Sequence, residues 1–146
     1  MKGECEMQEQ YKYLPHTADV KFEAYGISLR DLFRNAALAA CNAMYETKKV
    51  EAKKTLQIEL RAESKEQLLH KFLEEILFRI DTERMLFRDF NLVIDEKLNS
   101  LRGEIAGEEI NAEKHTVKAL VKAITWHQFE LQKTPSGWKC TVIIDV

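Results

Sequence analysis

Two aspartates, Asp19 and Asp145, are the residues whose type and position could do chemistry together. Each lies in a strand-like segment, on the side opposite the apolar residues, which include Val20 in one segment and Ile144 in the other. If the two strands are neighbours, both carboxylates lie on one face of the sheet. Two carboxylates about 4 Å apart repel by roughly 4 kcal/mol at an effective dielectric of 20, so the pair would need a proton, a lysine or a metal ion.

The carboxylate of Val146 adds a third group of oxygens next to Asp145. Oxygen ligands alone favour a hard cation such as calcium, magnesium or manganese over zinc. The alternative is that the two aspartates are isolated and solvated, as most surface aspartates are. The residues alone leave both interpretations open.

Three further polar residues occupy unusual positions: His16 before the first long strand, and Lys122 and His127 near the C-terminus. Each histidine could shuttle protons or bind a ligand, or could be a hydrogen-bonded structural residue. Lys122 could neutralise the aspartates or project into solvent. The sequence contains no glycine-rich phosphate loop, nucleophile elbow or zinc-binding helix motif, so the familiar enzyme classes are not supported.

Composition and charge indicate one globular domain in a reducing compartment. The chain has 146 residues, 45% of them hydrophobic, which suits a single core. Its net charge of −2 lacks the cationic excess of an autonomous nucleic-acid binder. The cysteines, Cys5, Cys41 and Cys140, lack metal-site spacing, and we expect reduced thiols, buried for the last two. No secretory or membrane-spanning stretch is apparent, which predicts a cytoplasmic protein.

The hydrophobic periodicity predicts an α+β fold in which two helices pack on a mostly antiparallel or mixed sheet. Ser28 and Ser64 are candidate N-caps, and apolar stripes follow them, so helices are expected at about 28–45 and 65–83. Residues 1–10 have no apolar period and read as a flexible leader to a domain of residues 11–146. Strands are expected at 19–25 and 56–62 and, mainly as C-terminal hairpins, around 85–94, 98–106, 116–124, 126–133 and 138–145. Four glutamates flanking one hairpin are expected to form a solvated rim or a docking surface for a basic partner: Glu104, Glu108, Glu109 and Glu113.

Several segments resemble the archease family. The tetrapeptide His16-Thr17-Ala18-Asp19 is similar to the opening HTAD motif of that family. The segment from Val121 to His127, VKAITWH, resembles the family's IKAVTYH, with Trp126 where tyrosine is more common. Weaker similarity runs through residues 32–37, 68–77 and 103–104 and through Trp138 to the ending Ile144-Asp145-Val146.

This resemblance implies a role and a site. Archeases activate the RtcB-type tRNA-splicing ligase by helping its guanylylation and multiple turnover, and they do not join RNA themselves. By the same resemblance, Asp19, Asp145 and Val146 match positions that bind a divalent cation, calcium first and magnesium or manganese as alternatives. The implied partner is the ligase, with tRNA involved only through it and no membrane. A chaperone-like modulator and a metal-dependent phosphoester hydrolase built on Asp19, Asp145 and His127 are the competing hypotheses.

Overall fold

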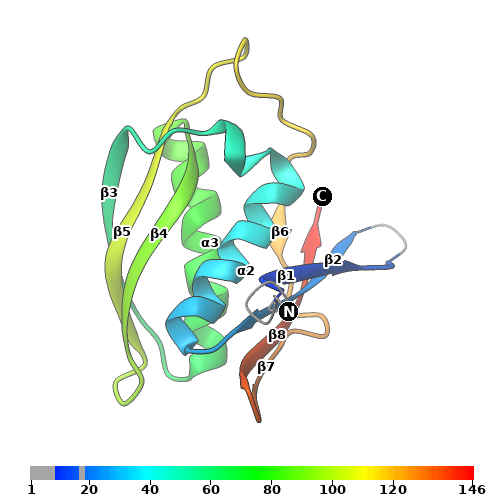
Figure 1. Ribbon diagram of the computed structural model, residues 1–146, viewed down its shortest axis with the longest axis vertical. Coiled ribbons are helices and arrows are strands. Elements are labelled where there is room, and N and C mark those ends of the chain that lie inside the picture. The colour runs from blue at the N-terminus through cyan, green and yellow to red at the C-terminus, as the bar shows by residue number, and fades with distance from the viewer. Residues whose placement is uncertain (1–8, 17–18) are drawn as a thin grey trace, which may run out of the picture.

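The computed structural model describes residues 9–16 and 19–146. Two long helices, α2 (Leu29–Met44) and α3 (Lys65–Glu83), lie between two antiparallel sheets (Figure 1). A short 3₁₀ turn, η1 (Thr47–Lys49), follows α2. The α+β class and both helices are therefore confirmed, with helix bounds within a residue or two of those expected.

The strands divide between a three-stranded sheet and a five-stranded sheet. The first has the order β3-β5-β4 and consists of β3 (Lys54–Arg61), β4 (Met85–Asp95) and β5 (Ser100–Glu109). The second has the order β1-β2-β8-β6, with β7 also paired to β8; its strands are β1 (Tyr11–Leu14), β2 (Val20–Gly26), β6 (Ala123–Ile124), β7 (Glu130–Thr134) and β8 (Gly137–Asp145). Two sheets replace the single one expected, because alternation shows which face of a strand is buried but not which strand it pairs with.

The prediction of a strand at 116–124 is mostly wrong, because only Ala123 and Ile124 pair with β8. The preceding residues pass from β5 in one sheet to β6 in the other, across the ends of the helices (Figure 1). A segment that crosses between sheets has no neighbouring strand, and Leu120 is 77% exposed. The strand expected at 126–133 begins only at Glu130, after a turn that contains His127.

Both helices begin as the sequence predicts. The Ser28 hydroxyl accepts the Asp31 N–H at 3.1 Å, and the Ser64 hydroxyl accepts the Gln67 N–H at the same distance. The Gln67 side chain in turn accepts the Glu63 N–H at 3.2 Å, close to a capping box. The apolar stripes that follow these caps pack in the core together with residues of both sheets.

One continuous core joins the two sheets through the helices. Leu68, Phe72 and Ile76 of α3 are at most 1% exposed, as their stripe predicts. Phe22 of β2 and Val142 of β8 close the core from the five-stranded sheet. No helix in the described part of the chain is long and apolar enough to span a membrane.

Candidate functional site

The central strands of the five-stranded sheet bring Asp19 and Asp145 to the same end. β2 and β8 pair antiparallel, and the last pair of that ladder is Val20 with Ile144. Asp19 directly precedes Val20, and Asp145 directly follows Ile144, so the two aspartates lie at the same end of the two strands, directly beyond the last pair of the ladder. The condition that the two strands be neighbours is therefore met.

The hydrogen-bond pattern indicates how closely this pair approaches. The Tyr25 N–H donates to the carbonyl of Gln10, which directly precedes β1, so odd-numbered residues of β2 direct their backbone groups away from β8. The Ile143 carbonyl accepts the Thr125 N–H, so odd-numbered residues of β8 direct theirs away from β2. Continued one residue beyond the last pair of the ladder, this alternation would make Asp19 and Asp145 a pair of the non-hydrogen-bonded kind, in which opposite side chains are closest.

Asp145 is held from its other side by Lys122. The Lys122 backbone N–H donates to the Asp145 carbonyl at 2.7 Å, while the Lys122 side chain is exposed. Val146 is half-buried and packs against the core. The backbone at the end of β8 is therefore held by β2, by Lys122 and by the core. The side chains of Asp145 and Val146 are partly exposed to solvent.

The two candidate histidines are exposed. His16 follows β1, and Thr17 of the same motif lies outside the described residues. His127 lies in the turn before β7, where its N–H donates to the Thr125 hydroxyl at 3.3 Å. Between the described residues, no hydrogen bond or ion pair links either imidazole to Asp19 or Asp145.

The donors at this end fit a hard cation better than a transition metal. Within residues 9–16 and 19–146, no three His, Cys, Asp or Glu side chains form a metal-binding group. Asp19 and Asp145 supply carboxylate oxygens, and Val146 can add a main-chain oxygen. Calcium takes six to eight oxygens and magnesium six, so such a set would leave positions for water or for phosphate oxygens.

A second polar cluster, which the sequence did not predict, surrounds Glu108. Although expected in a solvated rim, Glu108 is only 6% exposed. Its Oε2 accepts the Lys114 ammonium and the Glu51 N–H, both at 2.8 Å, and the His115 Nε2–H at 3.0 Å. These interactions lower the pKa of Glu108 to about 2, the Lys114 contact being the largest cause.

This Glu108 cluster fastens the crossing segment to the three-stranded sheet. The Asn111 N–H donates to His115 Nδ1 at 2.9 Å, so the His115 proton is on Nε2, facing Glu108. A glutamate in a hairpin gives no local signal of burial, because its partners His115 and Lys114 come from the segment that follows.

An aromatic stack, equally unpredicted, connects α3 to the turn before β7. The His70 and Trp126 rings lie parallel, with centroids 3.8 Å apart, and Phe129 contacts both rings edge-on. His70 is buried, and its Nε2–H donates to the Ile124 carbonyl at 2.8 Å. The sequence signal that could have indicated this stack is His70 itself, a histidine within the apolar stripe of α3.

The thiols of Cys41 and Cys140 are buried and unpaired, as expected. Burial raises the pKa of each thiol to about 12. Burial therefore disfavours the thiolate form that a nucleophile or a metal ligand requires. Cys5 lies outside the described residues.

The protein is thus a small α+β domain in which two helices separate two antiparallel sheets, with Asp19 and Asp145 at one end of the five-stranded sheet. The sequence profile of the archease protein family (MTH1598/TM1083) matches residues 11–146. The chain belongs to the archease family.

Two archeases are similar to this chain over nearly their whole length. The archease of Methanosarcina barkeri is 36% identical over 141 residues, which cover 94% of this chain and 97% of that protein. The archease of Pyrococcus furiosus is 37% identical over 140 residues, with 94% and 99% covered.

Two solved structures share the fold. The solution structure of Methanobacterium thermoautotrophicum protein 1598 superposes with a TM-score of 0.83 at 40% identity, covering 94% of this chain and 99% of that one. The crystal structure of a Thermotoga maritima archease, described as a possible chaperone, gives a TM-score of 0.64 at 17% identity, covering 92% and 96%. At that identity the second likeness concerns the fold alone.

Proposed function

We propose that this protein activates an RtcB-type tRNA-splicing ligase, promoting its guanylylation and its multiple turnover, through an acidic site at the paired ends of β2 and β8. The observation that supports the proposal is the pairing of β2 with β8, which brings Asp19 and Asp145 to the same end of the sheet in a chain of the archease family. Two carboxylates brought close together repel, and a countercharge between them relieves that repulsion.

A divalent cation, with calcium first and magnesium or manganese as alternatives, would supply that countercharge at Asp19, Asp145 and Val146. When bound, such an ion offers positive charge to phosphate oxygens. The protein's own contribution would be to position the ligands: the β2–β8 pairing brings both aspartates to one end of the sheet, and the Lys122 N–H binds the Asp145 carbonyl. The incomplete set of protein oxygens suits a site that a partner's nucleotide completes.

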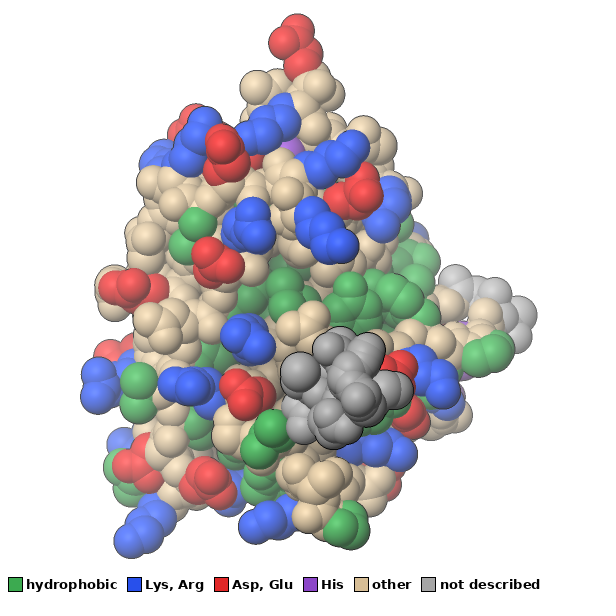
Figure 2. All heavy atoms as spheres, viewed as in Figure 1, with side chains coloured by type: hydrophobic (Ala, Val, Ile, Leu, Met, Phe, Trp, Pro, Cys, Tyr) green, Lys and Arg blue, Asp and Glu red, His purple; other side chains and the backbone are tan. Residues whose placement is uncertain are grey.

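The surface favours action through a protein rather than direct RNA binding. Figure 2 shows lysine and arginine side chains intermixed with acidic side chains over the visible face, without a continuous basic region. Together with the net charge of −2, this favours a ligase that holds the tRNA itself.

The proposal is tested by ligation of a tRNA exon pair by an RtcB-type ligase, with RNA in tenfold excess over enzyme. Adding this protein should raise the number of turnovers per ligase well above one. A ligase that turns over equally often alone would refute the proposal.

Chaperone-like modulation is the second candidate, because the Thermotoga maritima relative is described as a possible chaperone. It predicts that stoichiometric amounts of this protein suppress aggregation of a heated client without nucleotide. Activation of the ligase requires nucleotide, so the two assays separate the candidates.

A further inference from the structure

Strand β3 lies at an open edge of the three-stranded sheet, on the outside of the molecule (Figure 1). Directly after β3, the Ala62 N–H donates to the Asn99 carbonyl, so even-numbered residues of β3 direct their backbone groups toward β5. Thr55, Gln57 and Glu59 therefore direct theirs outward, where no strand in the described part of the chain pairs with them. This edge presents a row of backbone donors and acceptors to a further strand.

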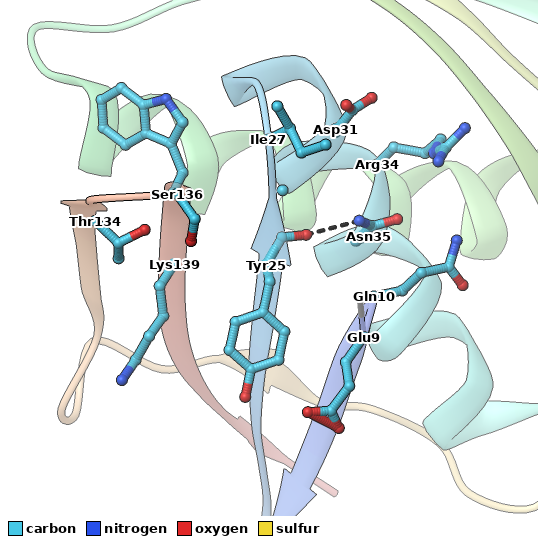
Figure 3. Close-up of a pocket in the computed structure, with 12 residues that line it drawn as sticks. Glu9, Gln10, Tyr25, Ile27, Asp31, Arg34, Asn35, Thr134, Ser136 and Lys139 are labelled. Atoms are coloured by element: carbon cyan, nitrogen blue, oxygen red, sulfur yellow. Dashed lines mark hydrogen bonds between the residues drawn. The ribbon is translucent and has the colours of Figure 1, made fainter. Parts of the chain in front are cut away.

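Near the other strand edges, short length, a side chain or a bulge interrupts the backbone row. β1 and β6 have only four and two residues. Beyond the end of β1, the Tyr25 carbonyl accepts the Asn35 amide at 2.7 Å (Figure 3). β4 is irregular between Phe87 and Asp89, and the Phe87 backbone groups bond the Tyr45 hydroxyl. Bulges of this kind are a usual protection against pairing, and the outward row of β3 lacks one.

The side chains of this edge match a second copy of the same edge in one antiparallel register. When Gln57 pairs with Glu59 of the second copy, Thr55 lies opposite Arg61 of that copy. No like charges are then opposite each other on the outer face of the sheet. Because the arrangement is two-fold symmetric, each of these contacts occurs twice.

Neighbouring registers are less favourable. A shift of two residues is the smallest that keeps the hydrogen-bond pattern. In one direction it sets Glu59 opposite Glu59 of the second copy, and in the other it sets Lys53 and Lys54 beside Arg61. Like charges directly opposite each other destabilise a sheet. The matched register instead brings Lys53 near Glu63 of the second copy, so charge selects this register.

Apolar side chains accompany the same edge. On the inner face, Leu56 would lie opposite Leu60 of the second copy, and both leucines are only half-buried in one chain. Phe78 of α3 is 58% exposed. It lies seven residues, about two turns, after Lys71, whose ammonium donates to the outward carbonyl of Arg61 at 2.8 Å. This side of α3 therefore faces the open edge of β3.

Phe78 is positioned close to the centre of this pairing. α3 runs back along β3 after the short connection of residues 62–64. Seven helical residues advance about 10 Å, as far as about three strand residues, so Phe78 lies near the level of Ile58. In the matched register the two-fold axis passes between the two Ile58 residues. The two Phe78 rings therefore face each other across that axis and cover each other's apolar surface.

We propose that β3 pairs antiparallel with β3 of a second copy of this chain, which joins the two three-stranded sheets into one continuous sheet and brings the two Phe78 side chains together. Such an edge contact belongs to the small interfaces, below about 1,200 Å², so the dimer dissociates on dilution. This inference is independent of the ligase proposal, because Asp19 and Asp145 lie in the other sheet.

Sedimentation equilibrium of the full chain, at protein concentrations up to about 1 mM, tests the dimer. The expected result is a reversible equilibrium between monomer and dimer. The outward amide hydrogens of Thr55, Gln57 and Glu59 should exchange with solvent more slowly in concentrated protein than in dilute protein. The Ala62 amide, already bonded to Asn99, should show no such dependence on concentration.

Gln57→Pro removes an outward donor from the edge. Because the Gln57 N–H faces away from β5, proline leaves the ladder within the sheet intact, and dimerisation should weaken at least tenfold. Gln57→Ala is the matched control. It loses the same side chain, including the bond to Glu104 at 2.8 Å, but keeps the outward N–H and should dimerise as the wild type does.

Phe78→Asp is an independent variant at an exposed helical position. It would set two carboxylates beside the two-fold axis and should also weaken the dimer at least tenfold. Leu120→Asp, at a position 77% exposed in the segment before β6, should dimerise as the wild type does.

A chain that remains monomeric at every concentration would overturn the proposal. Wild-type dimerisation in the folded Gln57→Pro or Phe78→Asp variant would assign the dimer to another surface and would also overturn it. The same holds for a dimer in which the outward amides of β3 exchange as fast as in the monomer.

Discussion

Asp19 and Asp145 directly adjoin Val20 and Ile144, the last residue pair between β2 and β8, and so lie at the same end of the five-stranded sheet. Residues at the beginning and the end of the sequence are thus brought together by pairing of the two central strands. The same pairing places the neighbouring apolar side chains in the core, so the acidic end is attached to a rigid part of the molecule. Side chains attached directly to the ends of paired strands hold their positions better than side chains in long loops.

The first prediction concerns cation binding at this end. Adding calcium at about ten times its Kd should stabilise the wild type by about 1.4 kcal/mol, since a ligand that binds only the folded state shifts unfolding by mass action. Asp19→Ala and Asp145→Ala should lose this gain, while their metal-free stability changes by no more than about 0.5 kcal/mol or rises as repulsion is relieved. Thermal unfolding with and without calcium measures both effects. Asp81→Ala, an exposed aspartate on α3, should respond as the wild type does, and a retained calcium response in the Asp19 and Asp145 variants would contradict the site.

The second prediction concerns acid stability. Because the pKa of folded Glu108 lies below its ordinary value of 4.5, at about 2, its contribution to stability is complete above about pH 4.5 and is lost as the pH falls toward 2. Glu108→Gln should therefore be destabilised at pH 7, and its difference from the wild type should shrink through this range. Urea unfolding at several pH values checks this. Glu109→Gln, at an exposed position next to it, is the control, and a constant difference for Glu108→Gln would exclude the ionised carboxylate as the cause.

The third prediction concerns the bulge in β4. The buried Tyr45 hydroxyl donates to the Phe87 carbonyl at 2.9 Å and accepts the Phe87 N–H at 2.8 Å, where the pairing with β5 is irregular. Tyr45→Phe leaves both backbone groups unpaired and should cost about 1–3 kcal/mol. Tyr13→Phe should cost less, because Tyr13 is 43% exposed and water can replace its bond to Ala39. Equal losses of unfolding free energy would contradict this account of the bulge.

The fourth prediction concerns the stack of Trp126 on His70. Trp126→Ala should destabilise the protein by about 0.5–1.5 kcal/mol beyond the lost buried area, whereas Trp126→Tyr keeps an aromatic face and should lose less. Chemical denaturation of both variants provides the comparison. Leu120→Ala, at an exposed apolar position, should change stability by no more than about 0.5 kcal/mol. A Trp126→Ala variant no less stable than Leu120→Ala would show that the stack contributes nothing.

Local sequence signals predicted the helices well, because caps and stripes lie within the segments they define. Ser28 and Ser64 make the expected bonds, and the stripe of α3 is buried. Strand β1 was not predicted, since four residues before Pro15 carry too short an alternation. Its pairing, like the division into two sheets, depends on contacts distant in sequence.

The candidate site was predictable in part. Strand parity placed Asp19 and Asp145 on one face only if β2 and β8 were neighbours, and pairing between strands at opposite ends of a chain leaves no local signal. Lys122 was expected inside a strand, but its contribution there is a backbone bond to Asp145. The burial of Glu108 could not be inferred, because it depends on how the crossing segment folds back.

The most direct test of the central claim is multiple-turnover ligation with an RtcB-type ligase, comparing the wild-type protein with Asp19→Ala and Asp145→Ala. Circular dichroism and thermal unfolding establish that the variants are folded, and Asp81→Ala serves as the matched control. The account predicts that both variants leave the ligase near a single turnover, while the wild type and the control sustain many. Wild-type turnover with either folded variant would contradict the proposed role of the paired aspartates.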